Sequence, residues 1–167
     1  MASTFSNRLK FELIGSGEQA GSWGTTTNNN LEIIDRAING VLTLTISGNT
    51  TLTTADGTLS NGHYKIILLT GSPSGAFNIT IDPNDQQKWY IFKNSTGQTA
   101  TVKQGGGSGT TVSIVNAATN LVYADGTGSN ANVGLVPTDL LNDTSPQLGG
   151  TLDTNGQAIQ FGSSKWT

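Results

Sequence analysis

The middle of the chain alternates between apolar and polar positions. Phe77, Ile79 and Ile81, for example, are separated by Asn78 and Thr80. A period of two places successive side chains on opposite faces of a β-strand, so it predicts strands with one buried face. By this criterion we expect strands at residues 8–14, 41–46, 50–54, 63–69, 77–81, 88–93, 98–103, 110–114 and 121–124.

Turn signals separate the expected strands. Asp56-Gly57, Asp82-Pro83 and Asn94–Gly97 each interrupt an apolar run with residues that favour tight turns. Short strands at intervals of about eight to twelve residues are typical of all-β domains. The pattern therefore predicts a mainly β fold, either a β-sandwich or a jelly-roll-like domain.

One helix is expected near the N-terminus, at about residues 30–39. Asn29 is a suitable N-cap, Glu32 stands three residues later as in a capping box, and Gly40 follows the last turn. Apolar residues recur there at helical spacing. They are Leu31, Ile34, Ala37 and Ile38, with Ile33 beside them.

The chain changes character after Ser129, because residues 130–167 contain no alternation long enough for a core strand. We therefore expect a β-sandwich domain at 1–133 and an extended segment at 134–167. A segment with so few bulky apolar side chains becomes ordered only against copies of itself. The candidates for contacts within a trimer are Leu148, Leu152, Ile159 and Phe161.

Composition excludes several classes of function. Charged residues make up only 11% of the 167 residues and the net charge is -3, which argues against a nucleic-acid partner. The chain has no cysteine, and so no disulfide, thiolate nucleophile or zinc-thiolate site. Without a run of about 18 apolar residues we expect no membrane insertion. The polar start, Met1–Asn7, does not match a signal peptide.

No constellation of catalytic or metal-binding residues is evident. His63 has no histidine or cysteine partner, so we expect a surface or structural role for it. Gly105–Gly109 precedes a strand and lacks the lysine of a phosphate-binding loop, which favours a hairpin loop. Asp82, Asn84 and Asp85 begin like a calcium loop, but no acidic residue closes it. We expect no enzyme activity, no cofactor and no metal.

Two groups of aromatic residues are candidates for binding. Trp89, Tyr90 and Phe92 form the densest aromatic patch and could stack on a sugar, although alternation must bury one face of their strand. Trp23 lies in a glycine-rich stretch, where it either packs on the nearby helix or reaches another subunit. With Leu31 and Ile34 it forms the candidate particle-docking surface.

Three stretches of sequence carry a resemblance to a known family. Residues 142–159 read NDTSPQLGGTLDTNGQAI, and residues 15–31 read GSGEQAGSWGTTTNNNL. Between them, YIFKNSTG at 90–97 is followed by TVK at 101–103, GSGTTV at 107–112 and LVYADGT at 121–127. These strings resemble bacteriophage tail-fibre and tail-spike proteins, and the first resembles the linker that opens the fibre shaft. Ile114–Ala117 departs from the family, which often has a proline-containing turn there.

The resemblance implies a virion structural protein: the N-terminal, particle-attached module of a fibre or spike. It implies a homotrimer, partners among the tail or portal-region proteins, and a role in host adsorption. The protein would be assembled in the host cytoplasm and released by lysis. Two alternatives stay open, a module that recognises host surface glycans and a capsid decoration or fibre protein. A polysaccharide-degrading enzyme is a third and weaker alternative, since no pair of catalytic carboxylates is evident.

Overall fold

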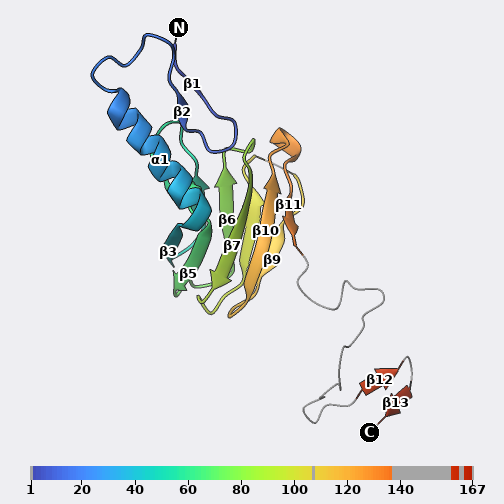
Figure 1. Ribbon diagram of the computed structural model, residues 1–167. Coiled ribbons are helices and arrows are strands. Elements are labelled where there is room, and N and C mark those ends of the chain that lie inside the picture. The colour runs from blue at the N-terminus through green and yellow to red at the C-terminus, as the bar shows by residue number, and fades with distance from the viewer. Residues whose placement is uncertain (1, 107, 137–158, 162–163, 167) are drawn as a thin grey trace. The chain divides into compact units, whose positions relative to one another are not determined.

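A computed structural model describes residues 2–106, 108–136, 159–161 and 164–166 of the chain (Figure 1). The chain divides into two compact units, Met1–Val136 and Pro137–Thr167. In the second unit, the described parts are two short strands, β12 (Ile159–Phe161) and β13 (Ser164–Trp166), which pair antiparallel. The first unit contains the rest of the described structure.

The first unit is a mainly β sandwich, as the sequence predicts, with one α-helix. The larger sheet has the strand order β11-β10-β7-β5-β3. Its strands are β3 (Val41–Ile46), β5 (Ile66–Gly71), β7 (Gln87–Asn94), β10 (Thr119–Asp125) and β11 (Val133–Leu135). The smaller sheet has the order β4-β6-β8-β9. Its strands are β4 (Thr50–Thr53), β6 (Phe77–Asp82), β8 (Ala100–Gln104) and β9 (Val112–Ile114).

Along the chain, the strands from β3 to β8 alternate between the two sheets. Within each sheet, neighbours of this series pair in parallel: β3 with β5 and β5 with β7, and likewise β4 with β6 and β6 with β8. The chain therefore winds through three turns of a flattened coil. Strands β9, β10 and β11 then add to the sheets in antiparallel pairs. Apolar alternation predicts the buried faces, but it does not distinguish parallel from antiparallel neighbours.

The core lies between the two sheets and follows the alternation. In β6, Phe77, Ile79 and Ile81 are buried while Asn78 and Thr80 are partly exposed. Burying each large apolar side chain contributes about 1.5–3 kcal/mol. The largest fully buried apolar residues come from strands of both sheets and from the helix: Tyr90, Phe92, Ile33, Ile46, Leu52, Ile67, Leu69, Ile79, Ile81 and Ile114.

The helix α1 (Trp23–Asn39) is longer than predicted, because it begins seven residues before residue 30. Its N-cap is Ser22, not Asn29, and Glu32 therefore lies within the helix. The first turns contain glycine, threonine and asparagine, which have weak helix propensity. A tertiary contact stabilises them: the Asn30 side chain accepts from the Glu12 N–H at 2.8 Å and donates to the Glu12 carbonyl at 2.7 Å. Gly40 follows the helix as predicted.

The strand predicted at residues 8–14 is wrong for most of its length. The structure has a short hairpin, β1 (Thr4–Phe5) and β2 (Glu12–Leu13), joined by a loop at residues 6–11. Lys10 has a φ of 55°, which a strand cannot include. Contacts to the sandwich hold this loop. The Leu9 carbonyl pairs with the His63 ring, and the Lys10 carbonyl accepts from the Gly57 N–H.

Residues just beyond Ser129 belong to the sandwich. Ala131 and Val133 are buried, and Val133 begins β11, which pairs with β10. The Val133 N–H donates to the Thr110 carbonyl, and the Val136 N–H donates to that of Leu121. The predicted domain boundary, between residues 133 and 134, therefore lies inside the edge strand β11. Within the described ranges, no helix combines the length and the apolar character needed to cross a bilayer.

Candidate functional site: a double hollow beside the N-terminal loop

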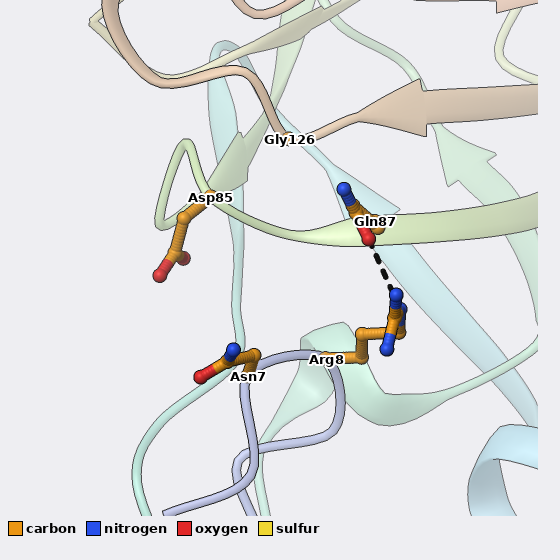
Figure 2. A pocket seen from close by; sticks show the side chains of 5 residues that line it. All are labelled: Asn7, Arg8, Asp85, Gln87 and Gly126. Atoms are coloured by element: carbon orange, nitrogen blue, oxygen red, sulfur yellow. Dashed lines mark hydrogen bonds between the residues drawn. The ribbon is translucent and has the colours of Figure 1, made fainter.

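A polar hollow lies where the loop at 6–11 meets the sandwich (Figure 2). Asn7 and Arg8 come from the loop, Asp85 from the turn before β7, Gln87 from the first position of β7, and Gly126 directly follows β10. Its volume is about 410 Å³, within the usual size of small-ligand sites. The lining offers amide donors and acceptors, one guanidinium and one carboxylate.

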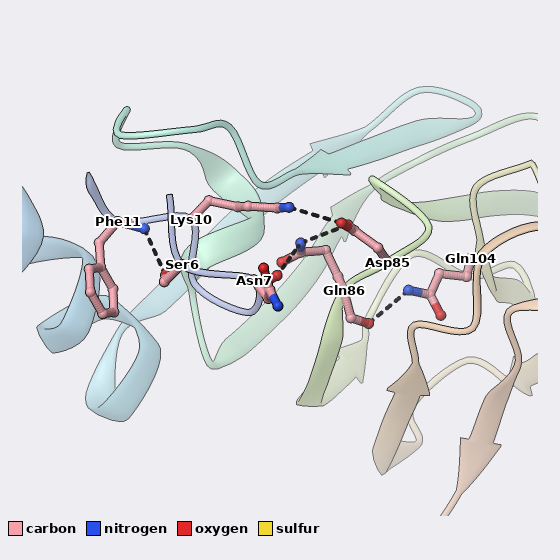
Figure 3. Close-up of polar contacts among 7 residues, drawn as sticks. All are labelled: Ser6, Asn7, Lys10, Phe11, Asp85, Gln86 and Gln104. Carbon is pink, nitrogen blue, oxygen red and sulfur yellow. Dashed lines mark hydrogen bonds and ion pairs between the residues drawn. The ribbon is translucent and has the colours of Figure 1, made fainter. Parts of the chain in front are cut away.

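A network of polar contacts fixes the wall of this hollow (Figure 3). The Lys10 Nζ forms an ion pair with Asp85 Oδ2 at 2.9 Å. Gln86 is fully buried and donates from Nε2 to Asp85 Oδ1 and to the Asn7 carbonyl, while Gln104 Nε2 donates to the Gln86 carbonyl. Desolvation acts to raise the pKa of Asp85, but the hydrogen bonds from Lys10 and Gln86 outweigh it and lower that pKa. Asp85 is therefore ionised at neutral pH.

A second hollow, of about 240 Å³, adjoins the first and shares Arg8 and Gln87 with it. These two side chains are joined by a hydrogen bond from Arg8 Nε to Gln87 Oε1 at 3.0 Å, visible in Figure 2. The other residues that line the second hollow are Leu9, Ala37, Ile38, Lys65, Lys88 and Trp89. We call the two together the double hollow.

The second hollow combines cations with an aromatic ring. The Lys65 Nζ lies 4.0 Å from the centroid of the Trp89 ring, a cation–π contact. Lys88 donates to the Gly62 carbonyl, which also accepts from the Tyr90 hydroxyl. Burial, and then the charge of Lys65, lower the pKa of Lys88 to about 7.

His63 has a structural role. It ends a short 3-10 helix at Asn61–His63 and is fully buried. Its Nδ1 accepts from the Ser60 N–H at 3.1 Å, so Nε2 carries the proton and donates to the Leu9 carbonyl at 2.9 Å. Burial and the charge of Lys88 lower the pKa of His63 to about 4. The neutral ring therefore ties the N-terminal loop to the sandwich.

The candidate sugar-stacking patch needs correction. Tyr90 and Phe92 are fully buried in the core, with ring centroids 5.7 Å apart. They expose no ring face to a ligand, because alternation along β7 points both of them inward. Trp89 points the other way and is 57% exposed. Only Trp89 of the three therefore remains a candidate, and it lines the second hollow.

The candidate docking residues lie on the outer side of α1. Trp23 is 63% exposed and Leu31 59%, while Ile34 is partly buried. Ile38, at 61% exposure, extends this group toward the C-terminal end of the helix. The fully buried residue of α1 is Ile33. Among the candidate trimer contacts, Leu148 and Leu152 fall outside the described residues. Ile159 and Phe161 lie in β12, where only the backbone is described.

Sequence reasoning did not find Arg8, Lys65 and Gln87. They are far apart in the chain, and the parallel pairing of β5 with β7 and the loop at 6–11 bring them together. In the part of the chain that the structure describes, no three histidine, aspartate or glutamate side chains are grouped to hold a metal ion. In comparisons with protein families, curated proteins and solved structures, nothing matches this chain. Its function therefore has to be argued from its own residues.

Proposed function

We propose that this chain is a structural module of a phage tail fibre or spike, and that α1 attaches it to the particle. The observation that carries the proposal is the outer face of α1, called here the helix stripe and formed by Trp23, Leu31, Ile34 and Ile38. At 100° per residue, these four side chains fall within one narrow sector of the helix. Three of them are more than half exposed.

A stripe of this kind supports attachment to another protein. Single exposed apolar residues are common on soluble proteins, but apolar residues gathered on one face mark an interaction surface. Thr27 is the one polar residue in the sector of the stripe. The stripe itself contains no charged side chain. Asp35 lies beside it, and Glu32 pairs with Arg36 on another side of the helix. Interfaces are depleted of charge at their centre and enriched in tryptophan.

The resemblance supports the same reading. The string at 15–31 that resembles tail-fibre openings ends within α1 and includes two residues of the stripe, Trp23 and Leu31. The strings between residues 90 and 127 fall on β7, β8, β9 and β10, so the resemblance covers both the sandwich and the helix that would dock. The homotrimer and the location in the virion remain parts of this proposal.

The test is incorporation into virus particles. In the phage that encodes this chain, purified particles should contain the protein, as measured by mass spectrometry. Trp23→Ala with Leu31→Ala should reduce that content at least tenfold, because it removes the centre of the interface. The matched control is Asn28→Ala, an exposed polar position on the same helix. Particles that lack the protein, or that retain the double variant at the normal level, would contradict the proposal.

A further inference from the structure

The second hollow concentrates positive charge in a chain whose net charge is negative. Arg8, Lys65 and Lys88 line it, and no acidic residue does. Among the described residues, the ion pairs are Lys10 with Asp85 and Arg36 with Glu32, so none of these three cations has a carboxylate partner. Burial lowers the pKa of Lys65, and burial together with the charge of Lys65 lowers that of Lys88. An anion in the hollow would relieve this repulsion.

Arg8 and Lys65 are the cations of the second hollow that keep hydrogen-bond donors without a partner among the described residues. Arg8 uses Nε on Gln87, which orients the guanidinium and leaves its terminal NH₂ groups without a partner among the described residues. Lys65 contacts the ring of Trp89, and its Nζ makes no hydrogen bond or ion pair with the described residues. Lys88 differs, because its ammonium already donates to the Gly62 carbonyl. A carboxylate matches the fork of a guanidinium.

Trp89 supplies a flat apolar surface beside these charges. Its side chain is 57% exposed, and the contact with Lys65 restrains the ring. The C–H groups of a sugar ring pack well on an indole, which has a large apolar body and a polar edge. The adjoining polar hollow then offers Asn7 and Gln87, whose amides both donate and accept as hydroxyl groups require.

The same polar hollow argues against a polyanion. Asp85 lines it and is ionised at neutral pH, so it repels a nucleic acid or a run of acidic side chains. A saccharide with one carboxylate on one ring places its charge beside Arg8 and Lys65, and its hydroxyls beside Asp85. We propose that the double hollow binds an acidic saccharide, with a sugar ring on Trp89 and its carboxylate on Arg8 and Lys65. Ile38 lies both in the helix stripe and in the lining of the second hollow, so binding is tested on the free chain, where attachment to a particle plays no part.

Isothermal titration calorimetry of the full chain tests the proposal. The probes are a trisaccharide with a single glucuronate and sialyllactose, each at millimolar concentration, with the methyl ester of each acid as its neutral partner. At least one acid should bind, and its affinity should fall as NaCl rises from about 0.05 to 0.5 M, because salt screens exposed charges. Trp89→Ala and Lys65→Gln should each weaken binding at least tenfold, which is about 1.4 kcal/mol.

Matched variants separate the site from general effects. Trp23→Ala removes an exposed tryptophan outside the site, and Lys93→Gln removes an exposed lysine of β7, the strand of Trp89. Both variants should bind as the wild type does. Arg8→Gln repeats the test if Lys65→Gln alters the melting curve. The proposal is overturned if no acid binds, if the methyl ester binds as tightly as the acid, or if Trp89→Ala binds normally. Tighter binding of hexaglutamate, unaffected by Trp89→Ala, would point to an acidic protein and would also overturn it.

Discussion

At the scale of single residues, burial separates side chains that the sequence makes look alike. Trp23, Trp89 and Phe92 are all large aromatics, yet Phe92 is fully buried and both tryptophans are more than half exposed. The period of two in β7 predicts that Trp89 and Phe92 face opposite ways, but it does not say which face is the core. The smaller sheet, assembled from distant segments, packs against one face of β7, and that face is therefore the core. In β7, Phe92 therefore contributes to the stability of the fold, while Trp89 is available for recognition of a ligand.

Truncating these residues should show the difference. Phe92→Ala should lower the free energy of unfolding by about 3–5 kcal/mol, because it leaves a cavity in the core. Trp23→Ala should leave it within about 0.5 kcal/mol of the wild type, as at other exposed positions. Urea denaturation followed by circular dichroism measures both. A large loss in Trp23→Ala would mean that the helix stripe supports the fold.

The buried His63 should make stability depend on pH. Its pKa is about 4 in the folded protein, below its ordinary value of 6.5, because of burial and of the charge of Lys88. The unfolded chain therefore binds more protons between these pH values, and stability is lost as pH falls through them. The loss should approach about 1.4 kcal/mol per pH unit in the middle of this window.

Urea denaturation at pH 7, 6 and 5 measures this dependence, and His63→Gln is the control. Glutamine does not titrate, so the variant should start less stable but show a flatter profile. Equal slopes for wild type and variant would assign the dependence to other groups.

At the scale of elements, α1 shows where local sequence rules stop. Its second half has the apolar spacing and the closing glycine that predict a helix, and the structure confirms the helix there. Its first half reads as a loop, because weak helix formers fill it. The side chain of Asn30 bridges to the backbone of Glu12, eighteen residues away, and holds that half in place. No local rule contains such a contact.

Asn30→Ala should therefore destabilise the first turns of α1. Two hydrogen bonds are lost, and the free energy of unfolding should fall by about 1–3 kcal/mol. Amide hydrogen exchange should increase selectively in the first half of the helix. Asn28→Ala, at an exposed position nearby, should change neither quantity. If exchange rises equally along the whole helix, the contact does not act locally.

The edge strand β11 gives a second test at this scale. A chain ending at Val136 should melt cooperatively near the temperature of the first unit in the full chain. A chain ending at Ser129 loses β11 and the buried Val133, and should be less stable by at least about 1.5–3 kcal/mol. Thermal melts by circular dichroism compare the two. Equal midpoints would show that β11 contributes nothing to the sandwich.

At the scale of the whole molecule, the sequence predicts the class of fold better than the site. Alternation is a local property, so the β-sandwich and most strands could be read from it. The double hollow depends on Arg8, Lys65 and Trp89, which meet only because parallel strands and a docked loop bring them together. The sequence predicts a sugar-stacking patch that includes Tyr90 and Phe92, although both side chains fill the core. A binding site built by topology leaves little trace in local sequence.

Self-association belongs to this scale too. We expect the full chain to be a trimer at micromolar concentration, because the sparse apolar residues of the segment 146–161 can be buried only between chains. Light scattering should give three copies for the full chain and fewer for a chain ending at Val136. A monodisperse monomer of the full chain would refute the trimer.

The winding of β3 to β8 between the two sheets has a consequence for evolution. Each turn pairs in parallel with the turns before and after it, as repeats do in solenoid proteins. Duplicating one turn would add a strand to each sheet and extend the core, and each added strand would find the same kind of parallel neighbours as its original. The antiparallel strands β9, β10 and β11 would still close the far end. Tandem duplication of a gene segment would therefore lengthen this architecture in whole turns.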